Sequence, residues 1–218
     1  MKLKVMRAVN EENDLIANEV RTILNDYGVL ALNLMSSPGS GKTSLLESTL
    51  AAMRDEMRFA VIVGDLFTMK DAERIDVLGV PVVQINTEGS CHLTANMIRE
   101  TLSEFDLEAV DCLFIENVGN LVCPSSFDLG EDYRVAILST PEGNDKIEKY
   151  PKMFRMAHVN LISKTDLSEA VDFDLADAQA KMHLLNPDAP VFQISTKTGL
   201  GMEDWYTWVR RLDLNKAI

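Results

Sequence analysis

Hydrophobic and polar positions follow two different periods along the chain. From Asn10, a candidate helix N-cap, apolar residues recur at helical spacing until Gly28, so this stretch is expected to be a helix. Seven short and nearly continuous apolar runs follow, at residues 29–35, 59–63, 80–85, 112–116, 134–139, 159–163 and 191–194. Runs of this kind are typical of parallel strands that are covered on both faces.

Helical segments separate these runs. We predict helices at about 41–54, from Thr68 with Asp71 completing a capping box, from near Ser90, from near Asp172, and at about 203–214. Strands and helices in alternation predict an α/β fold with a doubly wound, mostly parallel sheet. In such sheets ligands bind beyond the carboxyl ends of the strands, so the loops after the strands are expected to hold the chemistry.

Composition and charge exclude several classes of protein. Of the 218 residues, 46% are hydrophobic and 25% are charged, which is typical of a globular protein and not of a disordered one. A net charge of -13 argues against broad nucleic-acid binding. The early apolar run at 28–32 is too short to span a bilayer, and no signal-peptide pattern is present. We therefore expect a cytoplasmic protein with no nucleic-acid or membrane partner.

The loop after the first predicted strand, residues 36–43, has the spacing of a phosphate-binding P-loop, with Ser36 in the place of the first glycine. Gly39 and Gly41 allow backbone N–H groups to turn toward phosphate oxygens, while Lys42 reaches the β- and γ-phosphates and Thr43 places a hydroxyl on Mg²⁺. The predicted phosphate contacts are Ser37, Pro38, Gly39, Ser40, Gly41, Lys42, Thr43 and Ser44. We expect a lead-in helix at 1–28 and a single P-loop domain at 29–218.

Two later loops indicate which base is bound. Ser163-Lys164-Thr165-Asp166 resembles the Asn-Lys-x-Asp motif of G proteins, in which the aspartate accepts two hydrogen bonds from guanine and the lysine stem covers the base. Ser195, Thr196 and Lys197 resemble the Ser-Ala-Lys element that backs the base. Ser163 departs from the motif, which has asparagine at this position. A hydroxyl can still donate to one acceptor, but we do not expect it to replace an amide that also ties neighbouring loops together. The alternative is a solvated turn after a strand.

The three cysteines are an odd number, which does not indicate a disulfide framework, so we expect reduced thiols. Cys91 and His92 open a predicted helix after the third strand, and Cys123 follows the fourth strand. A helix N-terminus favours the thiolate, and two thiolates with an imidazole suit zinc or nickel. At such wide spacing, purely structural roles remain equally open. Cys112 lies in an apolar run and is expected in the core.

Motifs spread over nearly the whole chain resemble the HypB family of hydrogenase maturation GTPases. They lie at residues 36–43, 64–65, 71–75, 84–87, 91–93, 114–124, 126–131 and 149–151, and the stretch 116–123 is the most specific. The resemblance implies a SIMIBI-class G domain that assists nickel insertion into [NiFe]-hydrogenase. It also implies a GTP-dependent homodimer, with other hydrogenase maturation proteins and the hydrogenase large-subunit precursor as partners. The family's metal site corresponds to Cys91, His92 and Cys123, which would hold Ni²⁺ or Zn²⁺.

The family's frequent N-terminal cysteine motif and His-rich tract are missing from this sequence, so the resemblance does not imply high-affinity or storage binding of nickel at the N-terminus.

The predicted catalytic residues are Lys42, Asp65, Glu116 and Gly119. Asp65 and Glu116 follow the second and fourth strands, and with Thr43 they are candidates for the Mg²⁺ shell; Asp65 also orients the attacking water. Gly119 resembles the switch glycine that senses the γ-phosphate. We expect GTP to draw this loop toward the phosphate and so to move Cys123. Hydrolysis is expected to be slow, because the phosphate loop contains no obvious arginine finger.

Three other functions remain open at this point. The first is a metal carrier with little turnover, whose nucleotide site only regulates dimerisation. The second is a related maturation GTPase for another nickel or cobalamin enzyme. The third is a P-loop phosphotransferase, which the lack of an Arg-rich lid segment disfavours.

Overall fold

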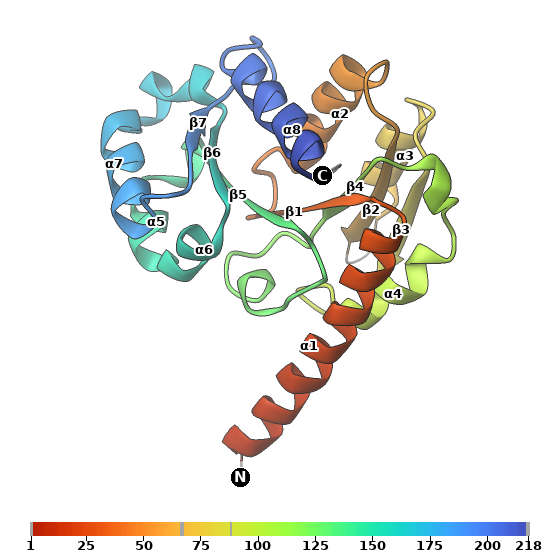
Figure 1. The fold of residues 1–218 in the computed structure, drawn as a ribbon. Helices are drawn as coiled ribbons and strands as arrows, with labels where there is room; N and C mark the ends of the chain where they lie inside the picture. The colour runs from red at the N-terminus through yellow and green to blue at the C-terminus, as the bar shows by residue number, and fades with distance from the viewer. Residues whose placement is uncertain (1, 66–67, 88, 217–218) are drawn as a thin grey trace.

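The structure, a computed structural model, describes residues 2–65, 68–87 and 89–216, with side chains placed for 11–65, 68–87 and 89–212 (Figure 1). Its strands are β1 (Leu30–Ser36), β2 (Phe59–Asp65), β3 (Val82–Asn86), β4 (Cys112–Glu116), β5 (Tyr133–Ser139), β6 (Val159–Ser163) and β7 (Val191–Gln193). They form one sheet in the order β3-β2-β4-β1-β5-β6-β7, and all of the pairings are parallel. The predicted α/β fold with a parallel sheet is confirmed.

Eight α-helices accompany the sheet in the described part of the chain. They are α1 (Lys2–Asp26), α2 (Lys42–Met53), α3 (Lys70–Asp76), α4 (Ala95–Leu102), α5 (Asp145–Lys149), α6 (Pro151–Met156), α7 (Leu175–Leu185) and α8 (Met202–Lys216). Short 3-10 turns lie at Leu107–Ala109, Pro124–Ser126, Thr140–Glu142, Thr165–Leu167 and Glu169–Val171. Helix α1 packs beside α4 and extends away from the body at its N-terminal end (Figure 1).

Alternate side chains of the strands supply the two faces of the core. On β1, Leu32 and Leu34 join a buried cluster with α2, α3 and α8, in which Trp205 is fully buried. Ala31 and Met35 face the opposite side, where α1 and α4 cover one half of the sheet and α5, α6 and α7 cover the other half. Because both faces are covered, the strands are apolar throughout, as the sequence pattern indicates.

Several predicted helix starts are wrong. Helix α1 begins at Lys2, so Asn10 lies inside it and is not its N-cap. Thr68 does not cap α3, because its backbone N–H and hydroxyl donate to Asp65 instead, at 3.1 and 3.2 Å. Helix α4 begins at Ala95, where the Thr94 side chain accepts from the Met97 N–H. The helix predicted from near Asp172 is α7, which begins at Leu175 with Asp174 as its N-cap.

Among the described helices, none combines the length and the apolar character needed to cross a membrane.

Candidate nucleotide and metal sites

The P-loop lies between β1 and α2, at the carboxyl edge of the sheet. Gly39 and Gly41 have φ angles of 74° and 100°, which glycine adopts without strain, and these turns bring the loop around to the start of α2. Beside the loop is a cavity of about 360 Å³. It is lined by Pro38, Gly39, Gly41, Lys42, Thr43, Ser44, Gly64, Asp65, Asp71, Arg74, Glu116, Asn117, Val118, Gly119 and Lys164. Most of the predicted phosphate-contacting and catalytic residues are therefore brought together.

Lys42 lies at the base of this cavity with only 7% of its surface exposed. Its Nζ donates to the Ser36 hydroxyl at 3.0 Å. Burial lowers the pKa of Lys42, and the nearby Glu116 carboxylate opposes that shift. Ser36, the residue that departs from the P-loop pattern, is thus the hydrogen-bond acceptor of the P-loop lysine.

Thr43 and Glu116 form a buried pair across the cavity. The Thr43 hydroxyl donates to Glu116 Oε1 at 2.9 Å. Glu116 Oε2 is also buried, and it has no hydrogen-bond partner among the residues that the structure describes. Burial raises the pKa of Glu116 to about 7. A buried carboxylate oxygen without a partner is costly unless a donor or a cation joins it.

The rim of the cavity beyond β2 carries charged side chains of both signs. Asp65 ends β2 and accepts hydrogen bonds from Thr68. Arg74 on α3 reaches the cavity and donates to Glu47 and to the Ser44 hydroxyl, at 2.9 and 3.1 Å respectively. The sequence motif at 71–75 contained Arg74, but only the fold brings its guanidinium to the cavity.

Gly119 lies directly against the P-loop. A Cβ atom at this position would be 2.7 Å from the backbone nitrogen of Pro38, so any larger residue forces the two loops apart. The close approach supports the prediction that the segment after β4 responds to what the P-loop holds.

Of the predicted base-binding residues in the loops after β6 and β7, Lys164 reaches the P-loop and lines the cavity. Lys164, in a left-handed conformation with φ 58°, donates from Nζ to the Gly39 carbonyl at 2.6 Å. The Ser195 hydroxyl donates to Asp166 Oδ1 at 2.7 Å. Asp166, Thr196 and Lys197 are exposed and do not line the cavity.

The interpretation of Ser163 needs correction. Its hydroxyl donates to the Ser40 carbonyl at 2.7 Å in a buried contact. The side chain therefore does tie the loop after β6 to the P-loop, which the sequence interpretation had denied to a hydroxyl. The short side chain is sufficient because β6 ends directly beside the P-loop.

A further carboxylate, Glu142, was missed by the sequence interpretation. Its Oε2 accepts from the Ser40 hydroxyl at 2.7 Å and from the Ser139 N–H and hydroxyl at 2.8 and 2.7 Å. It thus fastens the P-loop to the turn after β5. Ser139 and Glu142 have the spacing of a capping box, a signal that was present in the sequence.

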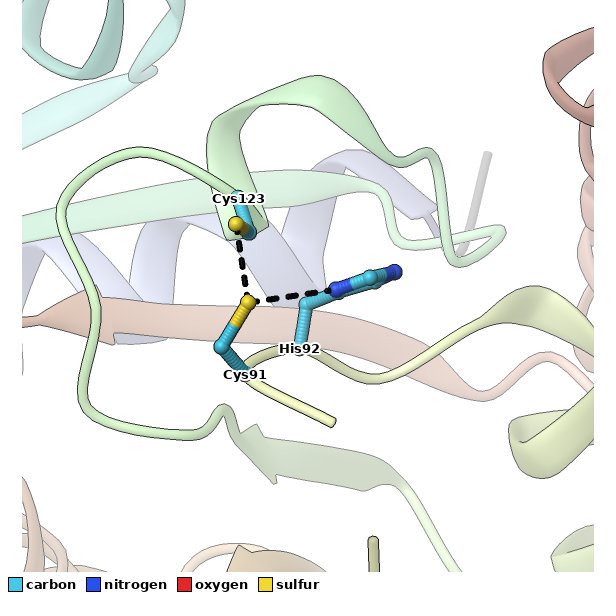
Figure 2. A group of neighbouring side chains, drawn as sticks. All are labelled: Cys91, His92 and Cys123. Carbon is cyan, nitrogen blue, oxygen red and sulfur yellow. Dashed lines mark hydrogen bonds between the residues drawn. The ribbon is translucent and has the colours of Figure 1, made fainter. Parts of the chain in front are cut away.

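The predicted metal ligands also lie close together, in the loops that follow β3 and β4 at the carboxyl edge of the sheet. Figure 2 shows the sulfur atoms of Cys91 and Cys123 facing each other, with the His92 ring beside them and its nearer nitrogen toward Cys91. Cys91 Sγ lies 2.9 Å from Cys123 Sγ and 3.8 Å from His92 Nδ1, and one ligand atom of each residue lies within 4.8 Å of the others. Both thiols are free and half-buried. This donor set fits a borderline-soft divalent ion such as nickel or zinc.

The environment of this cluster differs in one respect from the prediction. Cys91 and His92 lie in the loop before α4 and not at a helix start, so the helix-dipole argument for a thiolate at Cys91 is wrong. The Cys91 hydrogen bond, together with partial burial, raises the pKa of Cys123. Burial lowers the pKa of His92, whose ring stacks on Phe127 at 3.9 Å and is thereby held in position. Cys112 is fully buried in β4, as predicted.

Asn117 lies between the two sites. It lines the cavity, and its Oδ1 accepts from the Val118 N–H at 2.9 Å and from the Leu93 N–H at 3.3 Å. Its Nδ2 donates to the Asn33 side chain of β1 at 3.1 Å. One buried amide therefore contacts both the segment that leads to Gly119 and the segment that carries His92.

Comparison with known proteins shows the family to which the chain belongs. The family profile described as "CobW/HypB/UreG, nucleotide-binding domain" matches residues 30–193. The hydrogenase maturation factor HypB of Azotobacter vinelandii is 47% identical over 209 residues, which are 96% of this chain and 69% of that protein.

Two solved structures are similar over almost their whole length. HypB from Archaeoglobus fulgidus superposes with a TM-score of 0.88 at 40% identity, covering 93% of this chain and 99% of that one. HypB from Helicobacter pylori in complex with nickel has a TM-score of 0.88 at 42% identity, covering 94% of this chain and 96% of that one. With a matching profile, sequence relatives and architecture, this chain belongs to the CobW/HypB/UreG family of nucleotide-binding proteins, among its HypB hydrogenase maturation factors.

Proposed function

We propose that this protein binds and slowly hydrolyses GTP and uses that reaction to assist nickel insertion into [NiFe]-hydrogenase. The observation that carries the proposal is the convergence of a complete P-loop pocket and a Cys91-His92-Cys123 cluster at one edge of the sheet, with Asn117 in contact with both segments. Membership of the family supports the same role.

The pocket fits a nucleoside triphosphate with Mg²⁺. Thr43 and the unpartnered Oε2 of Glu116 offer hard oxygen atoms, and Asp65 lies on the same cavity. These three residues would hold Mg²⁺, which neutralises charge on the β- and γ-phosphates. Lys42 binds the same phosphates from the P-loop, and the carboxylate of Asp65 accepts a hydrogen bond from the attacking water and orients it.

We assign guanine as the base on the strength of Asp166. Its exposed carboxylate is held by the Ser195 hydroxyl, and the Lys164 stem lies beside the P-loop, where it would cover the ring. Two acceptor oxygens on one carboxylate match the ring N–H and the exocyclic amine of guanine, and adenine lacks that pair of donors. Parallel titrations with GDP and ADP test the assignment, and equal affinities would refute it.

Nickel is the proposed cargo of the Cys91-His92-Cys123 cluster. Two thiolates and one imidazole accept both nickel and zinc, so ligand chemistry alone does not choose between them. The nickel complex of the Helicobacter pylori relative supports nickel. Equilibrium titration of the purified chain with each metal, in the presence of a chelator of known affinity, measures the preference.

The two sites are proposed to be coupled. A γ-phosphate near Gly119 would draw in the segment after β4, which ends four residues later at Cys123, while Asn117 links the same segment to Leu93, next to His92. Coupling of this kind is reciprocal, so nickel must change GTP affinity by the factor by which GTP changes nickel affinity. Nickel affinities that are equal with GDP and with a non-hydrolysable GTP analogue would overturn the coupling.

In the cell, we propose that the chain acts in the cytoplasm as a GTP-dependent homodimer, with other hydrogenase maturation proteins and the hydrogenase large-subunit precursor as partners. Single-turnover hydrolysis of GTP, measured with and without nickel, tests the central claim. A chain that binds GTP without converting it to GDP would instead be a nucleotide-regulated metal carrier. Co-purification in the presence of GTP tests whether the hydrogenase large-subunit precursor is the client of this chain.

A further inference from the structure

The cavity contains one cation that the P-loop motif does not supply. Among the described residues that line it, Arg74 is the only arginine; the other cationic residues there are Lys42 and Lys164. Lys42 is engaged at the base of the cavity by Ser36, and Lys164 at the far end of the P-loop by Gly39. Lys42 and Arg74 both act electrostatically on the side of the cavity that carries Asp65, Asp71 and Glu116, and of these two cations Arg74 is the one that comes from outside the P-loop.

The present contacts of Arg74 keep its guanidinium close to the phosphate-binding residues. Its Nη2 is 3.1 Å from the hydroxyl of Ser44, the residue that follows Thr43, and its Nη1 is 3.5 Å from Asp71. The fork of the guanidinium binds Glu47 on α2, with Nε and Nη2 at 2.9 and 2.5 Å from the two carboxylate oxygens.

The ion pair with Glu47 is easily exchanged for another anion. The Arg74 and Glu47 side chains are 42% and 33% exposed, so water and salt screen their attraction. Glu47 presents two oxygens of a planar group to the fork, and a phosphoryl group presents oxygens in a similar arrangement. The guanidinium of Arg74 can therefore bind a phosphoryl group with the same pair of N–H donors that now bind Glu47.

We propose that Arg74 is a catalytic residue, an arginine supplied by the chain's own α3 that binds the γ-phosphoryl group of GTP during hydrolysis. The assignment rests on the proposed GTPase function. In the reaction, the oxygen of water bonds to the γ-phosphorus and the bond from that phosphorus to the β–γ bridging oxygen breaks. The bridging electron pair stays on GDP, and one proton of the water ends on solvent or on the released phosphate. Arg74 balances the negative charge on the γ-phosphoryl oxygens.

The test compares Arg74→Ala and Arg74→Lys with wild type and with Arg58→Ala. Arg58 is a matched control, because it also binds a carboxylate, Asp111, but at the amino ends of the strands, away from the cavity. Three quantities are measured: single-turnover GTP hydrolysis, GDP affinity, and GDP affinity with aluminium fluoride, which mimics the transferred phosphoryl group.

We expect Arg74→Ala to slow hydrolysis by about 100-fold or more. Its GDP affinity should be unchanged, and aluminium fluoride should no longer increase that affinity. Arg74→Lys keeps the positive charge but lacks the paired N–H donors of the guanidinium, so we expect it to retain only part of the wild-type hydrolysis rate. Hydrolysis equal to that of Arg58→Ala overturns the assignment. So does a parallel loss of GDP affinity, which would mean that Arg74 only maintains the shape of the pocket.

A second variant, Glu47→Gln, weakens the restraint on Arg74. The proposal expects hydrolysis at or above the wild-type rate, and a fall comparable to that of Arg74→Ala contradicts it. If the wild-type chain hydrolyses no GTP, the proposed GTPase function fails, and aluminium fluoride binding still decides the role of Arg74. If aluminium fluoride increases the GDP affinity of the wild-type chain but not that of Arg74→Ala, the assignment is supported. If it does not increase the GDP affinity of the wild-type chain, the assignment is overturned.

Discussion

The nucleotide pocket and the cysteine–histidine cluster lie at the same edge of the sheet but are built in different ways. The pocket is fixed by hydrogen bonds between segments far apart in sequence: Ser163 with Ser40, Ser40 with Glu142, and Thr43 with Glu116. The cluster consists of three half-buried side chains on two loops, with Phe127 stacked on the imidazole as additional support.

This difference separates a preformed site from an adjustable one. Because these bonds join the P-loop to the ends of β4, β5 and β6, the P-loop itself needs little rearrangement to accept phosphate, and the proposed movements in the pocket are confined to Arg74 and the segment that carries Gly119. Three ligands leave one position of a tetrahedral site open, and a shift of the loop that carries Cys123 changes the distances from Cys123 to both of the other ligands. The nucleotide pocket is therefore suited to recognise which nucleotide is bound, and the cysteine–histidine cluster is suited to bind or release a metal ion.

The largest expected effect comes from Lys42→Ala, which removes the buried cation of the pocket. Hydrolysis of GTP should fall by about 10³-fold, because a preorganised donor is lost where charge develops. Metal affinity measured without nucleotide should stay unchanged, since Lys42 does not contact the cluster. Lys181→Ala, which removes a partly exposed lysine paired with Asp177 on α7, is the control. Weaker metal binding by the nucleotide-free variant would contradict the separation of the two sites.

The converse experiment is Cys123→Ser, which removes one soft ligand from the cluster. Nickel affinity should fall by about 100-fold, while GDP affinity remains that of wild type. Cys112→Ala provides the comparison, because that thiol is buried in β4 and faces neither site. The interpretation would be refuted if both substitutions weakened nickel binding equally. Competition against a metallochromic chelator supplies the affinities.

A smaller effect is expected for Gly119→Ala, which tests the connection between the two sites. The added methyl meets Pro38 and separates the segment after β4 from the P-loop, a strain worth about 1.4 kcal/mol, or tenfold in affinity. The loss should affect a non-hydrolysable GTP analogue more than GDP, and the influence of that analogue on nickel affinity should shrink. Equal losses for the two nucleotides would mean that Gly119 does not sense the γ-phosphate.

The smallest change expected is that of Ser163→Ala, which deletes one buried hydrogen bond to the P-loop. Guanine-nucleotide affinity should fall by about threefold, the usual contribution of a single neutral hydrogen bond. Ser168→Ala removes a hydroxyl that bonds only to the local Thr165 carbonyl, and it should leave the affinity unchanged. If Ser163→Ala matched this control in calorimetric titration, the tie between the loops would not contribute to binding.

Features that are local in sequence were predicted from it. The P-loop and the strands depend on short runs of residues, and the structure reproduces both. The metal ligands, 32 residues apart at Cys91 and Cys123, were candidates from their residue types and their places after two strands, but their spacing left structural roles equally open, and the family resemblance favoured the metal site. Parallel pairing of β2 with β3 and of β2 with β4 brings the two loops to the same edge.

Features that depend on tertiary contacts were missed or misjudged. The role of Arg74 depends on how α3 packs beside α2, and that of Ser163 on how closely β6 ends beside the P-loop. The helix starts near Thr68 and Ser90 were wrong because the side chains of that region are used elsewhere. Thr68 binds Asp65, and Ser90 donates to the His92 carbonyl, so neither caps a helix.

The position of Trp205 has a practical consequence. Its indole N–H donates to the Thr49 hydroxyl at 2.9 Å on α2, the helix that follows the P-loop, and it stacks on Trp208 with ring centroids 5.4 Å apart. These are the chain's two tryptophans, and both lie in α8. All indole fluorescence of the chain therefore comes from one pair of rings on the back of the phosphate-binding helix. A change in that emission on adding nucleotide is an optical signal from α2, obtained without an attached dye.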